Sequence, residues 1–308
     1  MFKKILFATS ASPACDDAAR VAFDLAQRYK AKVFAFHVLG VPTRAFSRFV
    51  VDVRTGEEVT IDDDYVQWVK EEMKNTYSRQ IEKCDNYDIE CVIGVPHREI
   101  LRMARKEDVY LIVMGASTRE SEPDAPHRKG YAGSTLQKVA KAARCPVLTI
   151  YRSAASFWGG ISRVVFGTDF SKASDHAFQF ALNLAKETGA ELSLFHAFDI
   201  SALHAGKALE QDEIEDRLRE ARNKMRSKYL SKMKGFADYE LEVWEGIPYV
   251  EIVKFSREKQ ADLIVMAHHT GDPDPEQAML GSTMEQVILR ASCPVVSVNH
   301  PDKVAAEA

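Results

Sequence analysis

Two short segments combine a glycine with two hydroxyl residues where a helix is expected to begin. A helix start of this kind offers free backbone N–H groups and the positive end of the helix dipole, which together favour an anion such as a phosphate. Serine also caps helices without any ligand. The segments are therefore candidates either for phosphate binding or for helix capping alone. They are Gly133-Ser134-Thr135 and Gly281-Ser282-Thr283.

These segments occupy equivalent positions of an internal repeat. Thr9 is separated from Thr168 by as many residues as His37 is from His196, and further matches follow in the same order to the end of each half. Ordered matches over most of each half indicate a duplicated domain, and 308 residues suit two domains of about 150 residues. We expect a first domain at residues 1–152, a linker at 153–162, a second domain at 163–300 and a tail at 301–308.

Each half alternates short apolar runs with amphipathic segments. Runs such as Ile5–Ala8 and Arg163–Gly167 are typical of strands buried on both faces of a parallel sheet. The alternation predicts an α/β fold with a doubly wound, parallel sheet in each half. Ser171 is expected to cap a helix, and the insertion at 49–61 is expected to form a hairpin. Long helices are expected at 63–84 and 213–234.

Ligands bind beyond the carboxyl ends of the strands in such sheets. Four segments of each half reach that edge: the loop after the first strand, the end of the second strand, a glycine-proline turn, and the loop from the fourth strand to the last helix. The candidates in the first half are Thr9, Ser10, Val38, Gly94, Met114, Gly115, Thr118, Gly133, Ser134 and Thr135. Those in the second half are Thr168, Asp169, Ala197, Gly246, Met266, Ala267, Thr270, Gly281, Ser282 and Thr283.

In these loops and in the Cys-Pro that precedes the last strand, each half resembles a universal stress protein domain. The resemblance implies a Rossmann-like, adenine nucleotide α-hydrolase-like fold. It also implies that the glycine loop cradles the ribose and phosphates of ATP or AMP, with Mg²⁺ if the ligand is ATP, and that the acid of the strand-one loop lies beside the nucleoside. It further implies a pseudo-dimer within the chain, in which Val147–Ile150 lies against Val295–Val298. A further homodimer stays open.

The two halves differ from the family's loop pattern, which reads Gly-x2-Gly-x9-Gly-Ser/Thr. Threonine replaces the second glycine in both halves, at Thr118 and Thr270, and Ala267 replaces the first glycine of the second half. Ser10 stands where the family has its acid, whereas the second half keeps Asp169. We therefore expect the second half to bind nucleotide better than the first.

Composition and motifs exclude several other functions. The net charge of −4 provides no basic field for nucleic acid, and no apolar stretch reaches the roughly 18 residues of a membrane span. Five cysteines without a Cys-x2-Cys spacing indicate free thiols in the cytoplasm. His268 and His269 lack a ligand set for a metal, and His37 and His196 are interpreted as packed side chains.

No catalytic triad, paired carboxylates or P-loop lysine can be assigned. We therefore expect no enzyme, but a stress-response protein that regulates by binding an adenine nucleotide. Two alternatives stay open: a weak ATP-hydrolysing or nucleotidyl-transferring enzyme, and a nucleotide-free scaffold.

Overall fold

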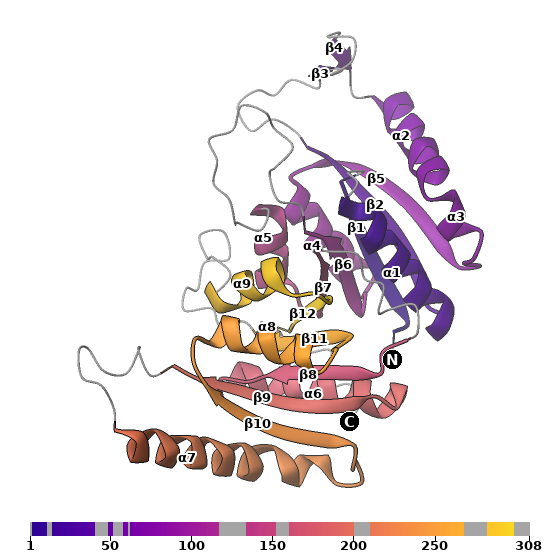
Figure 1. The fold of residues 1–308 in the computed structure, drawn as a ribbon. Helices are drawn as coiled ribbons and strands as arrows, with labels where there is room; N and C mark the ends of the chain where they lie inside the picture. The colour runs from indigo at the N-terminus through magenta and orange to yellow at the C-terminus, as the bar shows by residue number, and fades with distance from the viewer. Residues whose placement is uncertain are drawn as a thin grey trace. The chain divides into compact units, whose positions relative to one another are not determined.

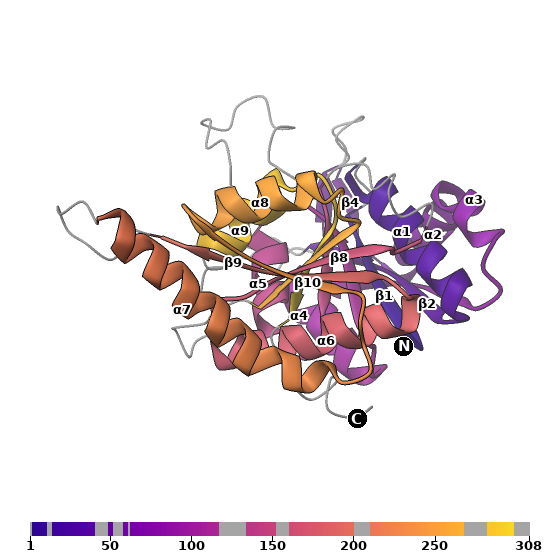
Figure 2. The ribbon, with the colours of Figure 1, turned by 60° about the horizontal axis from the view of Figure 1, so that its bottom comes forward.

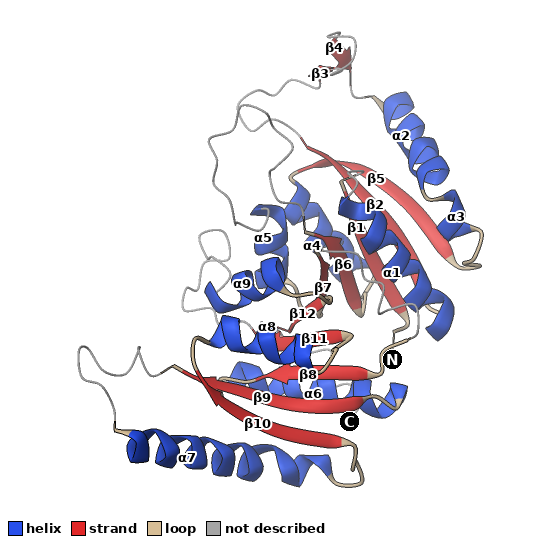
Figure 3. Cartoon of the chain, in the orientation of Figure 1, coloured by secondary structure: helices blue, strands red, loops and turns tan. Residues whose placement is uncertain are grey.

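A computed structural model describes residues 2–10, 14–40, 49–51, 58–60, 62–116, 134–151, 160–199, 210–267 and 282–298. The chain divides into two compact units, residues 2–115 and 116–308, which we call the N-terminal and C-terminal units. Figure 1 follows the chain by colour, and Figure 3 separates helices from strands. The last helix and strand of the first repeat belong to the C-terminal unit. The domain boundary expected at 153–162 stays a prediction.

The N-terminal unit contains a parallel sheet in the order β6-β1-β2-β5. Helix α1 packs on β1 and β6, α2 on β5, and α4 on β2 and β5. An antiparallel pair, β3 with β4, confirms the hairpin expected in the insertion. The strands are β1 (Lys4–Thr9), β2 (Lys32–Gly40), β3 (Phe49–Val51), β4 (Glu58–Thr60), β5 (Tyr87–Gly94) and β6 (Leu111–Gly115). The helices are α1 (Ala14–Tyr29), α2 (Asp63–Thr76), α3 (Ser78–Ile81) and α4 (Pro96–Lys106).

The C-terminal unit contains a sheet in the order β10-β9-β8-β11-β12-β7. Its strands are parallel except β7, which runs antiparallel to β12 and confirms the expected contact between the last strands. The strands are β7 (Val147–Ile150), β8 (Arg163–Gly167), β9 (Glu191–Phe198), β10 (Tyr239–Glu245), β11 (Leu263–Ala267) and β12 (Val295–Val298). The helices are α5 (Ser134–Ala142), α6 (Lys172–Thr188), α7 (Gln211–Tyr229), the 3-10 turn η2 (Leu230–Met233), α8 (Pro248–Glu258) and α9 (Ser282–Arg290).

Helices cover both faces of the sheet in the C-terminal unit. Figure 2 shows α6 and α7 on one face of the strands and α8 and α9 on the other. The middle strands are therefore buried on both sides, and Val164, Val165 and Phe166 of β8 are no more than 1% exposed. This burial explains why the strand is a continuous apolar run rather than an alternating one. The prediction of doubly wound α/β domains is confirmed.

Two helices are shorter than the sequence pattern indicates. The pattern predicted helices through 63–84 and 213–234. In the structure α2 ends at Thr76 and α7 at Tyr229, and the short helices α3 and η2 extend the helical segments to Ile81 and Met233. Tyr77, which follows α2, has φ −100° and ψ 17°, and Tyr229 has φ −112° and ψ −34°. Both tyrosine rings are no more than 1% exposed. The first helix is thus interrupted at Tyr77, whereas Tyr229 stays in the α region and α7 continues directly into η2. Both tyrosines place their rings in the core.

Candidate functional site

The loop after β8 brings a carboxylate to the edge of the sheet. Ser171 caps α6 as predicted, because its hydroxyl accepts a hydrogen bond from the Ser174 backbone N–H at 3.1 Å. Oδ1 of Asp169 accepts two hydrogen bonds, from the Ser171 N–H at 2.9 Å and from the Ser174 hydroxyl at 2.5 Å. The capping serines therefore hold the Asp169 carboxylate at the carboxyl end of β8.

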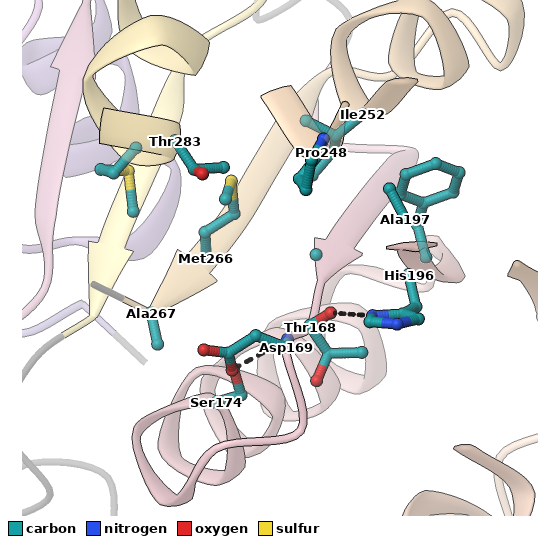
Figure 4. A pocket seen from close by; sticks show the side chains of 13 residues that line it. Thr168, Asp169, Ser174, His196, Ala197, Pro248, Ile252, Met266, Ala267 and Thr283 are labelled. Atoms are coloured by element: carbon teal, nitrogen blue, oxygen red, sulfur yellow. Dashed lines mark hydrogen bonds between the residues drawn. The ribbon is translucent and has the colours of Figure 1, made fainter. Parts of the chain in front are cut away.

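A cavity of about 260 Å³ lies beside this carboxylate. It opens between the ends of β8 and β11, where the order of strands along the chain reverses direction and where such sheets bind their ligands. Figure 4 shows Asp169 on one side, Met266 and Thr283 on another, and Ile252 and Pro248 across from them. The lining comprises Gly167, Thr168, Asp169, Ser174, Phe195, His196, Ala197, Pro248, Ile252, Met266, Ala267, Thr283 and Met284.

Gly167 gives the cavity wall its shape. A Cβ atom at this position would overlap Cδ1 of Ile252 and would stand 3.1 Å from Cγ of Met266, so both side chains would have to shift. The equivalent residue of the first repeat is Ala8. The glycine therefore lets Ile252 and Met266 pack directly against the end of β8 in the second repeat.

Helix α7 fixes the loop that carries Asp169. The Tyr229 and Thr168 hydroxyls are 2.7 Å apart, and Thr168 Oγ1 also accepts a hydrogen bond from the Phe170 N–H at 3.0 Å. The Lys228 ammonium donates to the Phe170 carbonyl at 2.8 Å, and the Lys224 ammonium lies 4.7 Å from the centre of the Phe170 ring. These contacts hold Phe170 at φ +63°, a left-handed conformation that few aromatic residues adopt.

His196 connects β9 to the same loop. Its Nδ1 lies 2.7 Å from the Thr168 carbonyl oxygen, and its ring centre lies 4.4 Å from that of Phe170. Burial is the main reason that the pKa of His196 lies below its usual 6.5. The Thr168 carbonyl and Asp169 raise this pKa, whereas Lys224 lowers it further. The sequence interpretation of a packed side chain is incomplete, because His196 also lines the cavity.

This lowered pKa predicts a loss of stability in acid. The unfolded chain binds the His196 proton more readily than the folded chain does, so the stability tied to the neutral ring is complete above pH 6.5 and is lost as the pH falls below it. His196→Asn retains an N–H donor but does not titrate. We expect the urea midpoint of the wild type to fall more steeply than that of the variant between pH 7.5 and pH 5. Parallel pH profiles of the two proteins would contradict this assignment.

The N-terminal unit repeats the tyrosine-threonine contact. The Thr9 and Tyr77 hydroxyls are 2.6 Å apart, and His37 Nδ1 lies 2.8 Å from the Thr9 carbonyl oxygen. Burial raises the pKa of Tyr77 to about 12. The hydroxyl pair and its histidine are therefore a feature of the repeat rather than of one site.

The strand-one loops of the two repeats differ in their polar groups. Ser10 and Cys15 occupy the places of Asp169 and Ser174. The Ser10 hydroxyl lies 3.4 Å from the Cys15 sulfur. At the same place in the second repeat, the Ser174 hydroxyl donates a 2.5 Å hydrogen bond to the Asp169 carboxylate. The first repeat thus offers no charged acceptor at this point of its loop.

The cavity brings together part of the predicted site. Of the candidates in the second half it gathers Thr168, Asp169, Ala197, Met266, Ala267 and Thr283. Gly246 is not among the lining residues; it has φ +132° and packs against the side chain of Glu251. Thr118, Gly133, Thr270 and Gly281 lie outside the described residues. Thr9, Val38 and Met114 are buried in the N-terminal unit.

Sequence reasoning missed several lining residues. Ser174 comes from the first turn of α6, Ile252 from α8 and Phe195 from the interior of β9. Pro248 belongs to the glycine-proline turn that the sequence placed at this edge. Tyr229 was missed as a support of the loop. One signal was available: a tyrosine recurs at the same place near the end of the long helix in both repeats, at Tyr77 and Tyr229.

Two further searches cover only the residues that the structure describes. None of their helices has both the length and the apolar character needed to cross a bilayer. Nor do three His, Cys, Asp or Glu side chains in this part of the chain gather as ligands for a metal ion.

Comparison with known proteins identifies the family of both repeats. The model of the universal stress protein family matches the chain twice, over residues 1–150 and 160–299. Universal stress protein MJ0531 of Methanocaldococcus jannaschii is 36% identical over 143 residues, which are 46% of this chain and 84% of that protein. Universal stress protein MJ0577 of the same organism is 28% identical over 154 residues, 45% of this chain and 94% of that protein.

A solved structure shows the same fold over the whole chain. The crystal structure of a universal stress protein from Archaeoglobus fulgidus has a TM-score of 0.66 at 20% identity and covers 96% of this chain and 98% of that one. The family model matches both repeats, and together the two matches span nearly all residues. The chain therefore belongs to the universal stress protein family, as a member with two family domains in tandem.

Proposed function

We propose that the second repeat binds an adenine nucleotide, ATP or AMP, and that the chain acts in a stress response by binding rather than by catalysis. One observation carries the proposal: the cavity at the ends of β8 and β11 joins the Asp169 carboxylate, an apolar wall and the first turn of α9. A nucleotide has three parts that match these features, namely hydroxyl groups, a flat base and phosphates.

The walls favour a base of limited size. A cavity of about 260 Å³ lies just below the ordinary range for small-molecule pockets, which begins at about 300 Å³. Met266, Ile252 and Pro248 supply apolar contacts for a flat ring. Asp169 supplies an acceptor for the hydroxyl groups of a ribose, and a charge-assisted hydrogen bond of this kind is stronger than a neutral one.

The phosphates are assigned to α9. Thr283 lies in the first turn of this helix and lines the cavity. The first backbone N–H groups of a helix lack intrahelical partners and favour an anion. Mg²⁺ would accompany ATP, because this ion commonly binds the phosphates of a nucleotide.

Catalysis is not part of the proposal. Hydrolysis of ATP needs an oriented water molecule, a group that positions or deprotonates it, and charge stabilisation on the phosphate that is transferred. The titratable side chains in the described lining are Asp169 and His196. Asp169 is engaged with Ser171 and Ser174, and His196 faces the Thr168 carbonyl. Neither is placed at α9, where the phosphates are assigned.

A cytoplasmic location and a pseudo-dimer within the chain complete the proposal. All five cysteines are free and buried, which supports a reducing compartment. The antiparallel pairing of β7 with β12 supports the pseudo-dimer, because it joins the last strands of the two repeats.

Calorimetry with ATP and with AMP tests the site. In Asp169→Asn the side chain keeps an oxygen for the Ser171 and Ser174 bonds but loses its charge. We expect affinity to fall about tenfold or more, because a hydrogen bond to a charged group contributes roughly 1.5–3 kcal/mol. The matched control Ser10→Ala should bind as the wild type does, and the wild type should release no phosphate from ATP. Unchanged affinity in Asp169→Asn would show that Asp169 is not part of the nucleotide site. If neither the wild type nor any variant binds nucleotide, the alternative of a nucleotide-free scaffold is supported.

A further inference from the structure

The ladder between the last strands has a local two-fold symmetry. Leu148 of β7 pairs with Val296 of β12, and these two residues hold the same position in their repeats. On either side of this pair, Thr149 pairs with Val295 and Val147 pairs with Ser297. Swapping the two repeats turns one of these pairs into the other, because Thr149 corresponds to Ser297 and Val147 corresponds to Val295. Both strands belong to the C-terminal unit. Either repeat therefore presents nearly the same strand edge, and the backbone alone does not select an unlike partner.

One side-chain contact breaks this symmetry. Gln137 is the fourth residue of α5, and Glu285 is the fourth residue of α9. The Gln137 amide donates a hydrogen bond to Glu285 Oε1 at 2.9 Å, and Glu285 is only 6% exposed. Gln137 and Glu285 therefore hold the same position in their repeats and meet across the local two-fold axis. The first repeat supplies a neutral amide there, and the second repeat supplies an acid.

We propose that this Gln137–Glu285 pair makes the surface formed by α9 and β12 of the second repeat selective for α5 and β7 of the first repeat. The same pair makes this surface unsuitable for pairing with α9 and β12 of another molecule. If two second repeats paired through the same ladder, Glu285 would meet Glu285 at hydrogen-bonding distance in a buried place. Two carboxylates there repel each other, and replacing a buried polar pair by a repulsive one is strongly destabilising. An amide in one copy removes the repulsion and supplies the donor.

The consequence concerns assembly. The last helix and strand of the second repeat accept those of the first repeat, so this surface is used within the chain and rejects the second repeat of another molecule. The first repeat carries the neutral member, so the acid in the second repeat imposes the selection. One repulsive contact can thus exclude the wrong partner while the correct partner still binds.

A charge exchange in the full-length chain tests the proposal. Gln137→Glu reproduces the rejected pairing inside the molecule, and its melting temperature should fall by at least about 5 °C at pH 7.5. The double variant Gln137→Glu/Glu285→Gln exchanges the two groups across the local axis and should regain most of that loss. Glu285→Gln, which pairs two neutral amides, should be the least affected single variant.

Two results would overturn the proposal. One is a Gln137→Glu protein whose melting temperature at pH 7.5 equals that of the wild type. The other is a double variant no more stable than Gln137→Glu, which would mean that each residue acts through its own surroundings. If Gln137→Glu does not fold, the double variant still tests the proposal. A folded double variant with a melting temperature near that of the wild type supports the proposal, and a double variant that also fails to fold contradicts it.

Discussion

Replacing Ala197 with phenylalanine is expected to weaken adenine nucleotide binding by about 100-fold or more, which corresponds to about 2.7 kcal/mol. Ala197 is the last but one residue of β9 and lines the cavity, and it is only partly buried. A phenylalanine ring at this position occupies part of a space of about 260 Å³ and displaces the ligand without entering the core. Titration calorimetry measures the effect, and circular dichroism verifies the fold.

The first repeat provides the matched control for this substitution. Val38 holds the position of Ala197 in the N-terminal unit. Val38→Phe should leave nucleotide affinity within about threefold of the wild type, because we place the ligand in the second repeat; a factor of three is less than 1 kcal/mol. The account fails if Ala197→Phe binds normally, and a loss in Val38→Phe alone would assign the site to the first repeat.

Replacing Tyr229 with alanine is expected to lower the free energy of unfolding by about 3–5 kcal/mol. The Tyr229 ring is fully buried; its centre lies 4.5 Å from that of Phe178 and 5.6 Å from that of Phe166. Removing the ring leaves a cavity and also removes the hydroxyl contact between α7 and Thr168. Urea unfolding followed by circular dichroism measures the loss.

A second substitution separates the ring from its hydroxyl. Tyr229→Phe keeps the packing and removes only the bond to Thr168, so it should cost about 1–3 kcal/mol. Tyr77→Ala, at the same place in the first repeat, should resemble Tyr229→Ala, because its hydroxyl makes the equivalent bond to Thr9. Equal effects of the alanine and phenylalanine substitutions at Tyr229 would show that the ring itself contributes nothing.

The sequence predicts the fold well because the features of nearby residues agree with the alternation of strands and helices along the whole chain. The apolar runs, the Ser171 cap and the insertion at 49–61 each depend on residues close together in the chain. The pairing of β7 with β12 was expected only through the family resemblance, since no pattern within either strand selects the other. The break between α2 and α3 at Tyr77 was not predicted, because Tyr77 is buried by tertiary packing and helix propensity does not mark this position.

The candidate site was predictable only in part. Asp169 and Met266 could be placed because each lies at the end of a strand, and strand ends meet at one edge of a parallel sheet. Ile252 and His196 line the same cavity, but their contribution depends on which way each side chain points in three dimensions. The replacement of Asp169 and Ser174 by Ser10 and Cys15 was visible in the alignment of the repeats, although only its first member was recognised.

Native mass spectrometry of the full-length protein with added ATP or AMP tests the central claim most directly. The account predicts one nucleotide per chain for the wild type, the same for Val38→Phe, and none for Ala197→Phe at the same ligand concentration. A wild-type chain that binds no nucleotide, or an Ala197→Phe chain that still binds one, would contradict the assignment of the second repeat as the nucleotide site.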